Sequence, residues 1–214
     1  MSKKISMAVI RRLPKYHRYL GNLIDRGINR VSSRELSEMM GFTASQIRQD
    51  LNNFGGFGLQ GYGYNADQLY KELEKILGLH KKYSTIILGA GNLGQAIANY
   101  SGFEKSGFEI KALFDINPKV IGTKIKDLEV LDMAGMEKFI RREKVSIAII
   151  CTPKDRAQEN ANRLVAAGIK GIWNFAPTDI TAPEHVKIEK VNLSESLFVL
   201  SYMLNDDYFK GKDE

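Results

Sequence analysis

Thr85-Ile86-Ile87-Leu88-Gly89-Ala90-Gly91-Asn92-Leu93-Gly94 decides the fold of the C-terminal part of this chain. Four residues suited to a strand lead into a G-x-G-x-x-G pattern, and residues 95–100 continue as a helix. The first glycine permits a tight turn, the second lets backbone approach a pyrophosphate, and the third lets helix and strand pack closely. The helix start offers free N–H groups to phosphates. The stretch therefore predicts a dinucleotide-binding unit.

A second strand supports this interpretation because it ends in an acid. Residues 110–114 are apolar enough for a strand, and Asp115 follows Gly94 by 21 positions. Such folds place there the carboxylate that binds a ribose 2′-hydroxyl. The predicted cofactor contacts in this part of the chain are Gly89, Ala90, Gly91, Asn92, Leu93, Gly94 and Asp115.

The residues that follow continue to alternate between strand and helix. Helices are expected over 132–142 and 155–167, and strands over 146–151, 171–175 and 186–190. The predicted fold class is α/β, a Rossmann-like doubly wound parallel sheet of roughly six or seven strands. Ligands bind beyond the carboxyl ends of such strands. The same crevice should therefore also contain Thr152, Pro153 and Asn174.

The charge of the chain is unevenly distributed. The net charge is +6, and residues 1–80 carry 12 Lys and Arg against 7 Asp and Glu, whereas residues 81–214 carry 19 against 18. This asymmetry favours an N-terminal module that binds a polyanion, although an inert basic surface would show it too. The single cysteine, Cys151, excludes an internal disulfide and, with no membrane span or signal peptide in the sequence, indicates a cytoplasmic protein.

The N-terminal residues predict a helix-turn-helix. Residues 5–26 have helical apolar spacing, but Pro14 suggests that the regular helix begins near Leu13. Two capping boxes follow, Ser32 to Glu35 and Thr43 to Gln46, and the turn between their helices contains Gly41 and Phe42. The second helix would read DNA, with contacts expected from Ser45, Gln46, Arg48 and Gln49. Any small helical domain can contain such a pair.

Residues 55–64 alternate glycine with aromatic and polar residues. They predict a hairpin in the position of a wing, where Gln60 could reach a minor groove. A flexible linker is the alternative, but Phe57, Tyr62 and Tyr64 argue against it because aromatic side chains favour burial. The expected domains are a winged-helix domain with its connecting helix (1–80), a dinucleotide-binding domain (81–191), and a C-terminal dimerisation helix and tail (192–214).

The last expected helix, residues 193–204, is apolar around much of its circumference. Burial against a second subunit would explain this, and packing across its own domain is the alternative. The sequence also lacks the usual groups of an enzyme. None of the three histidines is placed for proton transfer, and no metal-ligand spacing occurs. We therefore expect a nucleotide sensor without catalytic residues or a metal. An NAD-dependent oxidoreductase with a basic accessory domain and a regulator that binds coenzyme A are the alternatives.

The chain resembles the Rex family of redox-sensing transcriptional repressors over nearly its full length. The motifs that carry the resemblance are Arg11-Arg12-Leu13-Pro14-x-Tyr16, Ser45-Gln46-Ile47-Arg48-x-Asp50-Leu51, Phe54-Gly55-x-Phe57-Gly58, Gly61-x-Gly63-Tyr64, the glycine loop with Tyr100, Phe114-Asp115, Gly168-Ile169-x-Gly171-Ile172-Trp173-Asn174-Phe175-Ala176-Pro177 and Leu193-Ser194.

The resemblance implies a homodimer whose winged helices bind a palindromic DNA operator. It implies that NADH releases the DNA while NAD⁺ competes and permits binding, and that the C-terminal helix is exchanged between subunits. It places Tyr100 near the nicotinamide and adds Arg12 to the DNA-binding residues. Two departures stand out: Leu59-Gln60 replace a basic residue common at the wing tip, and Asn192 replaces a common Asp.

Overall fold

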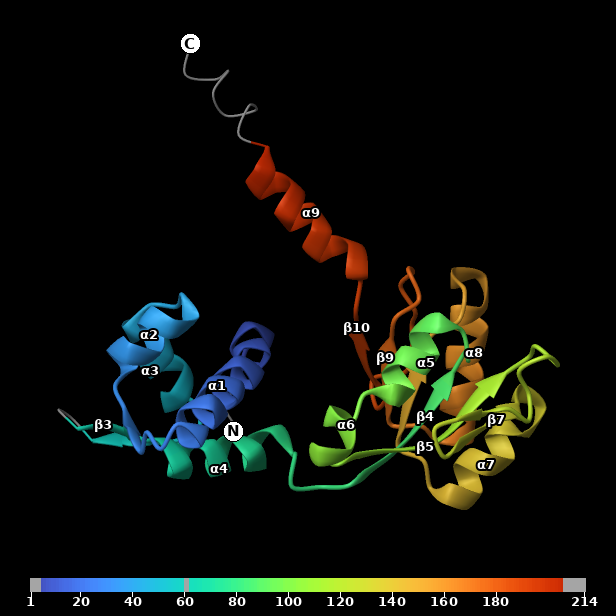
Figure 1. Ribbon diagram of the computed structural model, residues 1–214, viewed down its shortest axis with the longest axis horizontal. Coiled ribbons are helices and arrows are strands. Elements are labelled where there is room, and N and C mark those ends of the chain that lie inside the picture. Colours follow the sequence, from blue (N-terminus) through green and yellow to red (C-terminus); the bar gives the residue numbers. More distant parts are fainter. Residues whose placement is uncertain (1–4, 60–61, 206–214) are drawn as a thin grey trace, which may run out of the picture. The chain divides into compact units, whose positions relative to one another are not determined.

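The computed structural model describes residues 5–59 and 62–205, with the chain divided into two compact units, 1–81 and 82–214. Each unit is described here by itself (Figure 1). The first is mainly helical and carries a small sheet. The second is built on a large, mostly parallel sheet. The predicted α/β fold class is thereby confirmed, with an N-terminal helical unit before a Rossmann-like one.

The described residues of the first unit form four helices and three short strands. Their bounds are α1 Met7–Asp25, β1 Arg30–Val31, α2 Ser33–Met40, α3 Ala44–Asn52, β2 Gly58–Leu59, β3 Gly63–Asn65 and α4 Ala66–Leu77. A core of leucines, Tyr16 and Ile47 joins the helices. The hairpin β2–β3 is antiparallel and pairs with β1, in the order β1-β3-β2. A hairpin thus follows α3 where a wing was predicted.

The structure corrects the predicted start of the first helix. Helix α1 begins at Met7 and runs through Pro14 without a break. Proline removes one backbone hydrogen bond, to the carbonyl of Ile10 one turn earlier. Because Ile10 and Pro14 are both exposed, water can satisfy that carbonyl. Ser6, whose hydroxyl accepts from the Val9 N–H, caps the helix ahead of the predicted start.

The caps of the next two helices follow the predicted pattern in part. Ser32 and Glu35 form a complete capping box, in which each side chain accepts from the other's backbone N–H. Thr43 accepts from the Gln46 N–H at 3.1 Å, and the return bond recorded for the first box is absent from this second cap. Gly41, in the left-handed conformation, ends α2 and makes the turn to α3 tight.

Over residues 82–205, the second unit contains seven strands in the order β10-β9-β8-β4-β5-β7-β6, all parallel except β6. Its elements are β4 Tyr83–Leu88, α5 Asn92–Asn99, α6 Gly102–Lys105, β5 Phe108–Asp115, β6 Lys124–Ile125, β7 Leu128–Asp132, the 3₁₀ turn Met133–Gly135, α7 Met136–Glu143, β8 Ile147–Ile150, α8 Lys154–Ala167, β9 Gly171–Asn174, β10 Lys187–Lys190 and α9 Leu193–Leu204. The chain reverses its winding direction between β4 and β8, the switch point where such sheets bind ligands.

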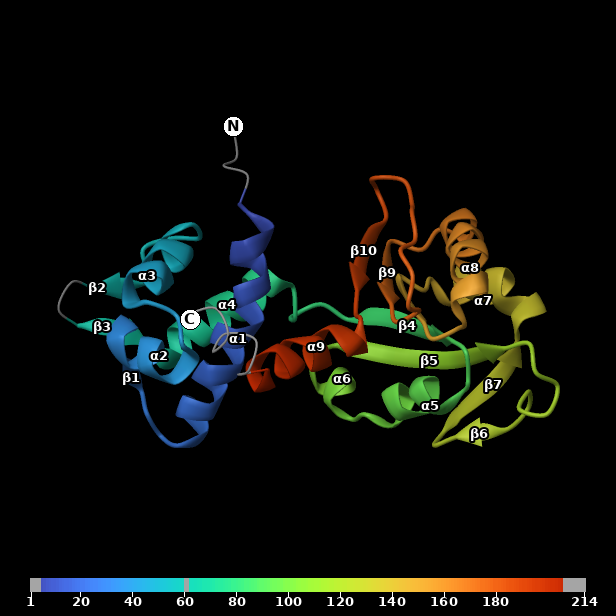
Figure 2. The ribbon, with the colours of Figure 1, turned by 90° about the horizontal axis from the view of Figure 1, so that it is seen from above.

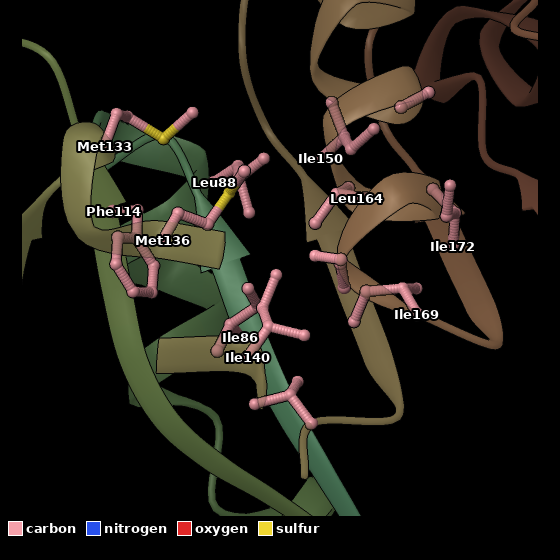
Figure 3. Packing of buried hydrophobic residues seen from close by; sticks show 14 of the residues in the cluster. Ile86, Leu88, Phe114, Met133, Met136, Ile140, Ile150, Leu164, Ile169 and Ile172 are labelled. Carbon is pink, nitrogen blue, oxygen red and sulfur yellow. The ribbon is translucent and has the colours of Figure 1, made fainter. Parts of the chain in front are cut away.

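Both faces of this sheet are covered, and the central strands are accordingly apolar over residues 86–88, 112–114 and 147–150. Ile86 and Leu88 point to the face that α7 and α8 cover, whereas Ile87 points to the other face. Figure 3 shows the first of these cores, where Phe114 and Met136 pack beside Leu88. The buried sheet fixes the positions of the strand ends that carry the candidate site.

Helix α9 differs from the other helices because its side chains are exposed along its whole length. Phe198 is 68% exposed and Met203 66%. In Figure 2 the helix follows β10 without covering either face of the sheet. Packing across its own sheet therefore does not account for its apolar sequence. Asn192 caps it by accepting from the Ser194 N–H at 3.1 Å.

Candidate functional site

Two of the three loop glycines are required by the protein's own packing. Gly89 directly follows β4 with φ +98°, and a Cβ there would lie 2.7 Å from the Cys151 carbonyl oxygen. A Cβ on Gly94 would overlap the Gly89 carbonyl oxygen. These glycines let the loop lie against β8 and let α5 lie against its own loop. Any side chain at either position would displace the loop.

Gly91 is different because the folded chain does not require it. Its φ of −72° suits any residue, and a Cβ there would meet nothing within 4 Å. No side chain caps α5, which begins at the next residue, Asn92. The loop thus leaves open space in front of an uncapped helix N-terminus, the geometry that accepts a pyrophosphate. The residues present fit a dinucleotide.

Asp115 lies at the end of β5, where its carboxylate meets the glycine loop. One oxygen accepts from the Ala90 N–H at 2.7 Å, and the other accepts from the Asn117 N–H at 2.9 Å. A carboxylate oxygen can accept more than one hydrogen bond. Asp115 can therefore accept a ribose hydroxyl while it remains bound to the loop.

A cavity of about 720 Å³ opens beside this acid. Its walls include the predicted residues Gly89, Gly91, Asp115, Thr152 and Pro153. Thr152 is fixed by Asn160, whose amide nitrogen donates to its hydroxyl at 3.1 Å. The cavity has the size and partly apolar lining of a nucleoside site.

The sequence reasoning missed part of this wall. Helix α8 contributes Arg156, Asn160 and Arg163, the loop after β5 contributes Ile116, and the 3₁₀ turn contributes Met133. Arg163 is held by Glu137 at 2.6 Å and by the Met133 carbonyl at 2.8 Å. The recurrence of polar residues at 156, 160 and 163, one helix face directly after a strand end, was a signal that could have indicated them.

The side chain of Asn174 lies below the crevice instead of lining the cavity. It is fully buried, its oxygen accepts from the Ala176 N–H at 3.0 Å, and its nitrogen donates to the Thr178 carbonyl at 2.8 Å. Asn174 thus shapes the loop after β9. Its predicted cofactor contact stays a prediction.

Tyr100 directly follows α5 and is 61% exposed. Its ring lies over Gly102, where a Cβ would come within 2.6 Å of the ring carbon Cζ. Phe103 packs edge-on against the ring, with centroids 4.8 Å apart, and in turn meets Trp173. Lys126 donates to the Asn99 carbonyl at 2.6 Å and ties the β6–β7 turn to this corner.

Cys151 is a packed strand-end residue. Burial raises the pKa of its thiol to about 12, so the thiol stays protonated at neutral pH. A reactive cysteine needs a lowered pKa and access to solvent. The structure therefore favours the packing role.

In the first unit, α3 presents the predicted DNA-reading residues. Ser45, Arg48 and Gln49 are exposed and Gln46 is half-buried. The Arg48 guanidinium donates to the Ser33 hydroxyl at 2.9 Å, which places it beside the start of α2. Gln60 lies outside the described residues.

Arg12 is directed at another side chain of the protein, whereas Ser45, Arg48 and Gln49 are exposed. Its Nε and Nη2 donate to the two carboxylate oxygens of Asp50 at 2.6 and 2.8 Å. Its side chain is only 18% exposed. The predicted DNA contact of Arg12 stays untested, but its Nε and Nη2 are directed at Asp50.

Within residues 5–59 and 62–205, no helix combines the length and apolarity needed to cross a bilayer. The same residues contain no cluster of three acidic, histidine or cysteine side chains suited to a metal ion. The fold and site define the class of protein: a winged helix-turn-helix unit joined to a Rossmann-like unit whose glycine loop fits a dinucleotide.

Comparison with known proteins identifies the family. A family model described as "CoA binding domain" matches residues 80–178, and one described as "Putative DNA-binding protein N-terminus" matches residues 4–52. The redox-sensing transcriptional repressor Rex of Clostridioides difficile (strain 630) is 64% identical over 96% of this chain and 98% of its own. That of Thermoanaerobacter sp. (strain X514) is 65% identical over 97% and 93%. This chain belongs to the Rex family of redox-sensing transcriptional repressors.

Solved structures agree with this assignment. The crystal structure of RSP, in complex with β-NAD⁺ and operator DNA, superposes with a TM-score of 0.92 at 63% identity, covering 98% of this chain and 97% of the other. RSP in complex with β-NADH gives 0.91 at 60% identity, covering 98% and 99%. RSP is itself described as a Rex-family repressor. The relatives are repressors and not enzymes, so the oxidoreductase alternative is not supported.

Proposed function

We propose that this chain represses transcription by binding operator DNA through its first unit and that NADH, bound at the glycine loop of its second unit, releases it. The single observation that supports NADH binding is the open space at Gly91, because nothing in the folded chain requires a glycine there. The second unit would supply NADH and NAD⁺ with the same contacts at the loop and at Asp115.

Asp115 favours NAD(H) over NADP(H) as the ligand. Its carboxylate is already held by the Ala90 N–H, so it cannot turn away from a ligand. A 2′-phosphate would bring like charge against it. Coenzyme A carries a phosphate on the neighbouring 3′-oxygen of its ribose, and the same repulsion disfavours it despite the description of the matching family model.

The proposal that the first unit binds operator DNA rests on α3 and the hairpin that follows it. Arg48 presents a planar guanidinium that can bind guanine, and Gln49 presents an amide that can bind adenine. Ser45, Gln46 and Gln60 complete the proposed contacts. A ligand can change DNA affinity only if it binds one arrangement of the protein better than another. We infer that the protein is a homodimer that binds a palindromic operator. The dimer would have two arrangements, and NADH would bind one of them more tightly than the other.

Helix α9 supports the dimer and the exchange of this helix between subunits. Its apolar side chains are exposed in the single chain, a state that is unfavourable in water. A second copy offers the same helix, so the two can cover each other's surface. Asn192, which caps α9, carries no charge where many family members carry Asp.

Fluorescence anisotropy on DNA from upstream of the chain's own gene neighbourhood tests the proposal, at one stated salt concentration. NADH should release the DNA, NAD⁺ should oppose that release, and NADPH and coenzyme A should have little effect. Release by coenzyme A instead of NADH would contradict the ligand assignment. DNA binding that ignores every nucleotide would contradict the sensor function, and absence of DNA binding would contradict the whole proposal.

A further inference from the structure

A buried carboxylate connects the first helix to the DNA-reading helix. Asp50, on α3, is only 2% exposed. It receives two hydrogen bonds from Arg12 in a bidentate pair and a third, at 2.6 Å, from the hydroxyl of Tyr16. Arg12 and Tyr16 lie one turn apart on α1, so one face of α1 supplies every hydrogen bond recorded for this side chain.

The same face of α1 also contacts the residue just before α3. Phe42 lies in the turn that leads to the N-cap Thr43. The Arg12 guanidinium lies 5.9 Å from the centre of its ring and the Lys15 ammonium 5.1 Å. The Tyr16 ring packs edge-on against the Phe42 ring, with the two ring centroids 6.2 Å apart. Arg12 and Tyr16 therefore hold α3 at both its beginning and, through Asp50, its last turn.

The chemistry of the Arg12–Asp50 pair fixes the orientation of α3 relative to α1. A bidentate guanidinium–carboxylate pair fixes angle as well as distance, because two parallel hydrogen bonds must form together. A carboxylate buried without its partner is strongly disfavoured. The burial that encloses Asp50 also raises the pKa of the Tyr16 hydroxyl, which keeps it a donor. Small rotations of α3 would break these bonds.

We propose that Arg12 is a positioning residue that sets the orientation of α3 through Asp50, and that it does not contact DNA itself. The inference rests on the proposed function, since it assumes that α3 reads the operator. It revises the role that the resemblance implied for Arg12. Base readout needs the side chains of Ser45, Arg48 and Gln49 to reach base edges together, so a misoriented α3 loses specificity more than general affinity.

Asp50→Asn separates this proposal from a charge effect. The substitution keeps the shape of the side chain and removes a negative charge, so electrostatics alone predicts tighter DNA binding. Positioning predicts weaker operator binding, by about tenfold or more, equivalent to losing one base contact. Arg12→Lys should show the same loss, because lysine keeps the charge but cannot form the bidentate pair. Arg12→Ala removes the guanidinium together with its charge, and Arg26→Ala, at the exposed C-cap residue of α1, is its matched control for a lost positive charge.

The measurement is operator and random-sequence DNA affinity for the full chain over a range of salt concentrations, with circular dichroism confirming the folded state. Operator affinity should fall, random-sequence affinity should change little, and the salt dependence should keep its slope. In Arg12→Ala, which removes the charge, equal losses on both DNAs with a slope reduced by about one would show that Arg12 contacts a phosphate. A lowered melting temperature with an unchanged specificity ratio would show a merely stabilising role. Either result would overturn the proposal.

The proposed function can fail separately. If wild type shows no preference for operator over random DNA, then α3 is not a reader. If wild type prefers the operator over random DNA, and Asp50→Asn and Arg12→Lys show the same preference, only the positioning inference is wrong.

Discussion

The carboxylate of Asp115 accepts the backbone N–H of Ala90 at 2.7 Å, so the acid at the end of β5 and the glycine loop after β4 form one connected structure. The two residues are 25 positions apart and meet because β4 and β5 are adjacent parallel strands. The hydrogen bond holds the loop and the carboxylate proposed to bind the ribose in fixed positions before any ligand binds. Pre-formed sites lose less free energy to ordering when they bind.

Asp115→Asn should weaken NADH binding and reduce discrimination against NADPH. An amide has only one acceptor oxygen, and removing a charged hydrogen bond costs about 1.5–3 kcal/mol, which is at least tenfold in affinity. Isothermal titration with both nucleotides measures the change. Asp127→Asn, an exposed acid at the β6–β7 turn, is the matched control and should behave like wild type. Unchanged NADH affinity in Asp115→Asn would remove this acid from the site.

Gly91→Ala and Gly94→Ala should produce opposite phenotypes. The Gly91 variant should keep the melting temperature of wild type and lose NADH affinity, because its Cβ meets only the space reserved for ligand. The Gly94 variant should lose about 1–3 kcal/mol of folding free energy, because its Cβ overlaps the Gly89 carbonyl. Thermal melting and NADH titration of both proteins test this pair. A destabilised Gly91 variant with normal affinity would contradict the pyrophosphate assignment.

Gly102→Ala should alter the response to NADH by displacing the Tyr100 ring. The added Cβ would come within 2.6 Å of the ring, so the tyrosine must leave its place on Phe103. If Tyr100 lies near the nicotinamide, the ratio of NADH to NAD⁺ affinities should change severalfold. Gly135→Ala, where a Cβ meets nothing within 4 Å, is the control. An unchanged ratio in both variants would show that the position of Tyr100 has no part in discrimination.

Leu200→Glu should convert the proposed dimer into monomers and abolish binding to a palindromic operator. Leu200 is 50% exposed in the single chain, and a charge would be costly if a second subunit covers it. Leu200→Met keeps the apolar volume and should remain dimeric. Analytical ultracentrifugation distinguishes the two. A dimeric Leu200→Glu protein would exclude Leu200 on α9 from the subunit interface.

The first unit should lose stability as pH falls below about 6.5, the ordinary pKa of histidine. His17 stacks on Tyr70 with ring centres 4.1 Å apart, and burial lowers its pKa although Glu74, 3.8 Å away, opposes the shift. Because the unfolded chain then binds more protons than the folded one, protonation favours unfolding until the pH passes below the folded pKa. His17→Phe should flatten this part of the stability profile in urea unfolding. His80→Phe, at an exposed histidine, should not.

The periodic and motif-bearing parts of the fold could be predicted from sequence because their signals are local. The predicted helix caps at Ser32 and Thr43, the turn at Gly41 and the apolar strands all depend on neighbours a few residues away. The helix start was misplaced because the effect of Pro14 depends on whether the Ile10 carbonyl is exposed, which sequence does not state. The far wall of the cavity was missed because α8 reaches the residues around Met133 through tertiary contacts, among them the hydrogen bond from Arg163 to the Met133 carbonyl.

By itself the sequence determined the fold class, the order of the units and the type of ligand. The reason is that glycine spacing, strand and helix periodicity and the acid at a strand end are patterns of residues close together in the chain. Tertiary structure alone decided which of those residues face a ligand and which face the protein. It placed Arg12 on Asp50, Asn174 inside its own loop and Gly91 in open space. The physical reason is that hydrogen bonding and packing between distant segments depend on three-dimensional distance, which a one-dimensional pattern does not contain.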